Sequence, residues 1–174
     1  MDTSNIPASV QSHVNETKLR GIYLSITVDI DFMLIMLIQE CFKPNLSEIE
    51  TYYFHKKGKG KDLCELTMFE RLDVCQQGLD KYHSESYQKH KESFTSADTL
   101  RKIRNKFAHD KIDNYISPND TTKLTFHKLR KNLMVEMKEY SISDLYKELD
   151  EYKNTGQELL RLISKVMGYT EPVF

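Results

Sequence analysis

The sequence contains little glycine and proline, the two residues that most often interrupt helices. Gly 6 and Pro 4 among 174 residues amount to roughly half of average usage. The hydrophobic fraction of 39% and the charged fraction of 29% are typical of a soluble globular protein. This composition favours an α-helical protein and excludes disorder throughout the chain.

An excess of one charge sign is also missing. The formal net charge is −1, so the whole molecule is not an electrostatic binder of nucleic acid or membranes. Any anion site must therefore come from local clustering. The segment from Arg101 to Lys131 offers such a cluster, with nine Lys and Arg residues against three Asp.

Cysteine usage and the N-terminal sequence predict a cytoplasmic protein. The three cysteines have no Cys-x-x-Cys spacing and leave one unpaired in any disulfide scheme, which favours buried thiols in a reducing compartment. The first residues lack the basic start and apolar run of a signal peptide. The most apolar stretch, Ile22 to Ile38, is interrupted by two aspartates, which argues against a membrane span.

Apolar residues at three- and four-residue steps predict an all-α bundle of four to five helices in a single domain, 1–174, with a flexible N-terminus at 1–9. The predicted helices are Val10 to Phe42, Ser47 to Lys56, Leu63 to Tyr82, Thr95 through LRKIRNKFAHD, and Asp144 to Val166. The polar stretch His83 to Ser93 is predicted to be a loop. Alternating apolar residues on either side of Arg130-Lys131-Asn132 predict a small β-hairpin before the last helix.

Two aspartates lie within the first predicted helix. Asp29 and Asp31 would be costly there unless they were paired or faced a polar cleft. Two alternatives remain open from the sequence: one of them faces Arg104, or both take solvent-facing or capping positions.

The segment Arg104-Asn105-Lys106-Phe107-Ala108-His109 carries the residue types of phosphodiester chemistry, with Phe107 and Ala108 as apolar anchors. A histidine near neutral pKa can move a proton to or from a ribose or leaving oxygen. An arginine can bind the phosphate and stabilise its developing charge. Asn105 and His109 are four residues apart and share a helix face, whereas Arg104 points about 140° away from His109.

These residues also admit a purely structural interpretation. Asn105 and His109 could tie the helix to its neighbours, while Arg104 makes a surface ion pair. The residue types and their spacing alone leave both interpretations open.

The motif in its context, LRKIRNKFAHD, resembles the R-x4-6-H motif of HEPN domains (higher eukaryotes and prokaryotes nucleotide-binding). The upstream TMFERLDVCQQGLDKY, the hairpin-like segment and SISDLYKELDEY resemble bacterial HEPN proteins of the toxin, phage-defence and mannitol-repressor-like branches. The resemblance covers about residues 15 to 167. It implies a bundle of four or five helices and a homodimer in which the two motifs face each other.

The resemblance further implies a metal-independent endoribonuclease without a cofactor, acting on RNA as a toxin or defence effector and leaving 2′,3′-cyclic phosphate ends. Arg104 would bind the scissile phosphate, His109 would act as acid or base, and Asn105 would position His109. The basic residues Arg101, Lys102 and Lys106 would contact RNA. An antitoxin or nucleotidyltransferase is the partner type expected of the family.

Two other functions are compatible with the same resemblance. The chain could be a non-catalytic HEPN dimer that acts as a regulator or scaffold, or a nucleotide-binding partner of a nucleotidyltransferase. Loss of RNA cleavage on substitution of Arg104 and His109, with fold and dimer intact, would distinguish catalysis from both.

Overall fold

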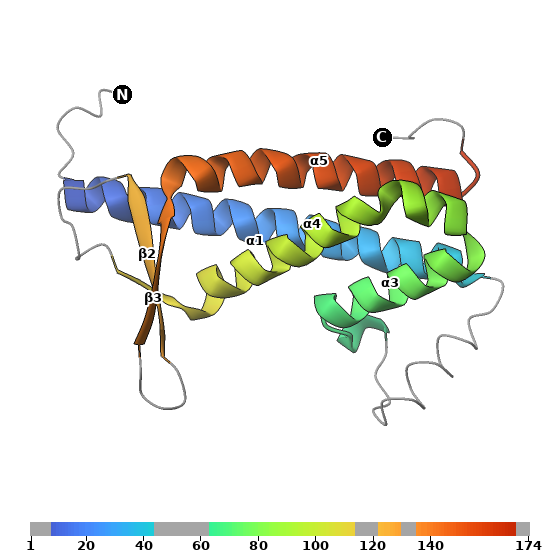
Figure 1. The fold of residues 1–174 in the computed structure, drawn as a ribbon, viewed down its shortest axis with the longest axis horizontal. Coiled ribbons are helices and arrows are strands. Elements are labelled where there is room, and N and C mark those ends of the chain that lie inside the picture. Colours follow the sequence, from blue (N-terminus) through green and yellow to red (C-terminus); the bar gives the residue numbers. More distant parts are fainter. Residues whose placement is uncertain (1–7, 44–62, 114–121, 130–134, 170–174) are drawn as a thin grey trace. The chain divides into compact units, whose positions relative to one another are not determined.

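The computed structural model describes residues 8–43, 63–113, 122–129 and 135–169 (Figure 1). The helix predicted at 47–56 and the Arg130-Lys131-Asn132 turn lie outside the described residues, as does most of the N-terminal segment 1–9. The described part is mostly α-helical, with a small antiparallel hairpin before the last helix, as predicted. Its elements are α1 (Ala8–Cys41), η3 (Leu63–Glu65), α3 (Met68–Tyr82), α4 (Ser84–His109), β1 (Lys111–Asp113), β2 (Lys123–Leu129), β3 (Val135–Ser141) and α5 (Ile142–Val166).

The chain forms two compact units, and the boundaries between them fall within α1, α4 and α5. One unit comprises Met1–Ser25 and Lys102–Glu151; the other comprises Ile26–Arg101 and Tyr152–Phe174. We call them unit 1 and unit 2 and describe each by itself.

Unit 1 contains the three-stranded antiparallel sheet, in the order β1-β2-β3. Leu124 and Phe126 lie on one face of β2 and are buried, Thr125 between them is buried as well, and the register places Phe126 opposite Lys138 of β3. Three aromatic rings connect the sheet to the helices: Tyr23 stacks on Phe107 at 4.8 Å between centroids, and Phe107 meets Phe126 edge-on at 5.0 Å. This aromatic stack is the centre of the unit 1 core.

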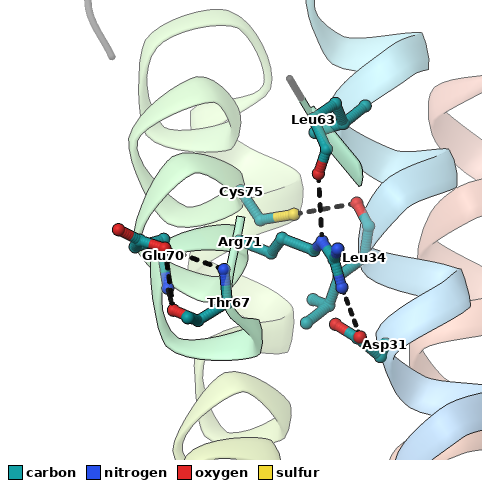
Figure 2. A network of polar contacts seen from close by, with 7 residues as sticks. All are labelled: Asp31, Leu34, Leu63, Thr67, Glu70, Arg71 and Cys75. Carbon is teal, nitrogen blue, oxygen red and sulfur yellow. Dashed lines mark hydrogen bonds and ion pairs between the residues drawn. The ribbon is translucent and has the colours of Figure 1, made fainter. Parts of the chain in front are cut away.

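Unit 2 contains a network of polar contacts around Arg71 (Figure 2). Arg71 of α3 donates to the Asp31 carboxylate of α1 and, through Nε, to the Leu63 carbonyl at 3.3 Å. Asp31 therefore pairs with Arg71, and the prediction that an aspartate of this helix faces Arg104 was wrong for Asp31. Asp29 is exposed, as the alternative interpretation required.

The described thiols are buried, as predicted. Cys41 and Cys75 are free cysteines with 2% and 0% exposure, and the Cys75 thiol donates to the Leu34 carbonyl at 3.3 Å. Burial raises the pKa of Cys41 to about 12 and that of Cys75 well above its usual value. Both groups are therefore neutral thiols in the folded protein. The side chain of Cys64 lies outside the described part.

Helix α4 begins at Ser84, so the prediction of a loop at His83 to Ser93 and a helix start at Thr95 was wrong. The segment has no glycine or proline, and its Lys, Glu and Gln residues form helices well. The buried Ser86 and Phe94, with Tyr87 edge-on to Phe94 at 5.9 Å, supply the inner face. Thr95 lies inside the helix, where its carbonyl accepts a bond from the Thr99 hydroxyl.

Helix α3 begins with a capping box in which Thr67 and Glu70 satisfy each other's backbone N–H groups (Figure 2). Leu72 and Leu79 are buried on its inner face. Phe69 is 54% exposed, and its ring lies 5.1 Å from the Arg101 guanidinium.

Helix α1 is apolar on most sides. By length and composition alone, its segment His13–Cys41 could cross a membrane, with 33% of the most apolar window buried. A core helix of a soluble protein passes the same test, so the length and composition of this segment are weak evidence for a membrane span. The segment carries Leu34, Leu37 and Ile38, which are fully buried, and Phe32, which is 61% exposed.

The last helix, α5, ends in a Schellman motif. Gly168 has φ +82°, its N–H donates to the Lys165 carbonyl at 3.1 Å, and the Tyr169 N–H donates to the Ser164 carbonyl at 2.8 Å. The glycine therefore terminates the helix.

Candidate functional site

The candidate motif occupies the last turns of α4, in unit 1. Phe107 is fully buried and anchors these turns in the aromatic stack, as predicted. Ala108, the other predicted anchor, is exposed; it lies about 100° around the helix from Phe107. The helix ends at His109, and β1 starts two residues later at Lys111.

An arginine of α1 holds the end of α4. Arg20 donates from Nη1 to the Phe107 carbonyl, and its Nη2 is 2.9 Å from the Glu16 carboxylate. The Phe107 carbonyl is one of the last four of α4, which lack an intrahelical partner, and a cation at a helix C-terminus is favourable. Arg20 thus fixes the backbone on which His109 is carried.

Sequence reasoning did not find this role of Arg20. Its only local signal is the spacing of four residues from Glu16, which is typical of any surface ion pair on a helix. The acceptor lies 87 residues away, and no sequence periodicity points to it.

The three proposed catalytic residues are not all brought together within one chain. Arg104 donates from Nη1 to the Asn105 amide oxygen at 3.1 Å, and both side chains are half-buried. His109 is exposed and makes no hydrogen bond or ion pair with any residue that the structure describes. Asn105 therefore contacts Arg104, whereas the sequence suggested that it could orient His109. Spacing by four residues permits such a pair but does not compel it.

The three proposed RNA-binding residues have different surroundings. Arg101, in unit 2, pairs with Asp98 at 2.7 Å. Lys102 is exposed. Lys106 donates to the hydroxyl of Tyr140 on β3, and its ammonium lies 4.8 Å from the centroid of that ring. Lys106 is thus the one of the three with a defined position against the unit 1 sheet.

Glu148, on α5 in unit 1, has a raised pKa. Burial is the main cause that raises the pKa of Glu148, and the nearby charge of Glu151 adds to it. The Tyr23 hydroxyl, which donates to the Leu145 carbonyl at 2.9 Å, lies 3.5 Å from Glu148 and lowers that pKa in part. Lys106 is another nearby charge that lowers it. The sequence reasoning did not single out Glu148.

The described part of the chain contains no group of three or more His, Cys, Asp and Glu residues placed to hold a metal ion. The functional groups at the candidate site are a guanidinium, an amide, an exposed imidazole and two ammonium groups. They belong to Arg104, Asn105, His109, Lys102 and Lys106. No protein-family model, curated protein or solved structure matches the chain.

Proposed function

We propose that the chain is a metal-independent endoribonuclease of the HEPN type, acting as a homodimeric toxin or defence effector in the cytoplasm. The observation that carries the proposal is the combination of an exposed imidazole and a fixed backbone at the end of α4. His109 is open to a substrate, while the buried Phe107 ring and the Arg20 contact to its carbonyl hold the turn that carries the imidazole.

The proposed reaction is an attack of the ribose 2′-oxygen on the neighbouring phosphorus. A neutral imidazole takes the proton of the 2′-hydroxyl, the new O2′–P bond forms, and the P–O5′ bond breaks. A second group in its acid form protonates the leaving 5′-oxygen. The products are a 2′,3′-cyclic phosphate and a 5′-hydroxyl, and no oxidant or metal enters the balance.

Arg104 supports this reaction by binding the phosphate. Its contact with the Asn105 amide oxygen uses one of five N–H donors, which leaves others for phosphate oxygens. Because Arg104 points about 140° away from His109 on the same helix, a second copy of the chain is proposed to complete each site.

The test is cleavage of RNA in excess EDTA by wild-type protein and by Arg104→Ala and His109→Ala variants. Loss of a positioned acid or base lowers the rate by about 10²–10⁴-fold. Two matched controls are His13→Ala and Arg161→Ala, because these side chains are 75% and 58% exposed. Circular dichroism and size-exclusion chromatography confirm that every variant keeps its fold and assembly.

Cleavage by the wild type and both controls, with loss in the two motif variants, supports the proposal. Intact RNA in every sample contradicts it and favours the regulator, the scaffold or the partner of a nucleotidyltransferase. Growth arrest on expression, abolished by His109→Ala, is the cellular counterpart expected of a toxin.

A further inference from the structure

Two lysine ammonium groups lie beside one tyrosine ring in unit 1. The Nζ atoms of Lys106 and Lys138 are 4.8 and 5.0 Å from the centroid of Tyr140. The two ammonium groups are therefore less than one Debye length apart, about 10 Å at 0.1 M salt. Positive charge is concentrated where helix α4 meets strand β3.

This positive charge is weakly compensated by the surrounding protein. Lys138 is exposed and forms no ion pair with any residue in the described ranges. The carboxyl group that interacts with Lys106 is Glu148, whose raised pKa reflects its partly buried position. Strand β3 carries two further acidic residues: Glu139, whose carboxylate lies 3.6 Å from Lys123, and Glu136, two residues before Lys138 on the same strand face, which has an interaction of its own. An anion would therefore meet two ammonium groups and little opposing charge.

The Tyr140 hydroxyl adds a neutral donor to the two ammonium groups. It accepts a hydrogen bond from Lys106, so its own hydrogen is available to another acceptor. No residue in the part of the chain that the structure describes accepts that hydrogen. The group that these three donors fit is one with several acceptor oxygens, such as a phosphate.

The ring itself is not placed as a platform for a base. Tyr140 is half-buried, meets Phe126 edge-on at 5.3 Å, and has both lysines beside it. Stacking would require an open aromatic face. The contacts favour recognition of the nucleic-acid backbone over recognition of a base.

We propose that Lys106, Tyr140 and Lys138 form a phosphate-binding site for the backbone of single-stranded RNA. The site rests on the proposed function, because it gives the RNA substrate a contact on the sheet beside the helix that carries His109. Lys138 and Tyr140 belong to β3, which the sequence motif does not include.

The test measures binding of a fluorescein-labelled single-stranded 12-nucleotide RNA by anisotropy over a series of salt concentrations. All proteins carry His109→Ala so that the RNA stays intact. The added changes are Lys138→Ala, Tyr140→Phe and the control Lys147→Ala, whose side chain is 78% exposed on α5 of the same unit. Circular dichroism checks each fold.

Loss of one phosphate contact lowers the slope of log K against log salt by about 0.7 for a single strand. We expect this change for Lys138→Ala and an unchanged slope for Lys147→Ala. Tyr140→Phe keeps both charges, so it should weaken binding without changing the slope.

Equal binding and slope for the Lys138→Ala and Lys147→Ala proteins would overturn the site, even if the wild type cleaves RNA. Inorganic phosphate and unlabelled RNA are each added as competitors of the labelled RNA. If inorganic phosphate displaced it at the same phosphate concentration as unlabelled RNA, the assignment to an RNA backbone would be overturned. A slope change in Lys138→Ala supports the site, and if the wild type nevertheless leaves RNA intact, the proposed function fails while the site stands.

Discussion

Replacement of Arg71 by methionine tests whether the polar network of unit 2 contributes to stability. Methionine keeps much of the apolar volume of the arginine stem but removes the guanidinium. Asp31 Oδ2 then loses its donor, while Oδ1 is already buried and without a hydrogen-bond partner in the described part of the chain. The Leu63 carbonyl loses its contact with Arg71 Nε as well.

The size of the effect follows from the burial of the two partners. Removal of one member of a buried ion pair costs about 3–5 kcal/mol because the other charge is left uncompensated. The Arg71 side chain is 8% exposed but that of Asp31 is 28% exposed, so water can reach the carboxylate in part. We therefore expect the lower end, about 3 kcal/mol, which corresponds to a fall of about 6–12 °C in Tm for a chain of this size.

A double variant distinguishes the loss of the ion pair from the cost of leaving the Asp31 carboxylate without a partner. Asp31→Leu combined with Arg71→Met removes both charges, and replacement of a buried pair by apolar residues is often neutral or stabilising. We expect the double variant to regain at least half of the loss. The control is Arg161→Met, because Arg161 pairs with Glu158 at the surface and such pairs contribute about 0–1 kcal/mol.

The assay is thermal and urea unfolding followed by circular dichroism. A loss below about 1 kcal/mol for Arg71→Met would refute the reasoning, because it would mean that Asp31 is fully hydrated without its partner. A double variant no more stable than Arg71→Met would refute the inference that the unpaired Asp31 carboxylate causes the loss of stability.

Three further predictions concern glycines and thiols. Gly78→Ala should destabilise by about 1–3 kcal/mol in urea unfolding, since its Cβ would lie 2.3 Å from Phe42 Cε2; an unchanged midpoint would show that the ring moves freely. Gly168→Ala should cost about 1–2 kcal/mol in the same assay through its positive φ alone, since the added Cβ would meet nothing within 4 Å, and equal stability would contradict this. Iodoacetamide at pH 8 should modify Cys41 and Cys75 only after unfolding, because burial raises the pKa of both thiols; rapid modification of the folded protein, read by mass spectrometry, would contradict their burial.

The elements that the sequence predicted well have strong local signals. Apolar spacing over α1 and α5 gave both helices, and the second ends beside Gly168, whose φ of +82° glycine adopts readily. Alternation around Leu124 and Phe126 gave the hairpin, and both of these side chains are buried.

The sequence did not predict the start of α4 because the first turns of this helix have few apolar residues on their inner face. Between His83 and Ser93 the inward-facing residues include Ser86, the half-buried Tyr87 and His90, whose side chain is 15% exposed, so the apolar period is too weak to read. Helix propensity and packing of Tyr87 against Phe94 decide the structure there.

The motif itself could be found from sequence, but its setting could not. Arg104, Asn105 and His109 form a local pattern, whereas the contacts of Arg20 with Phe107 and of Lys106 with Tyr140 join residues 87 and 34 positions apart. Pairings of this kind depend on tertiary packing, which leaves no periodic trace in a single sequence.

The contact between the Tyr23 hydroxyl and the Leu145 carbonyl has a consequence for synthesis of the chain. The two residues are separated by 122 positions, and both belong to unit 1. At about 5–20 residues per second, a ribosome needs roughly 6–24 s to add Leu145 after Tyr23. During that interval the core of unit 1 is incomplete, so the site proposed at the end of α4 can form only after Leu145 has been added.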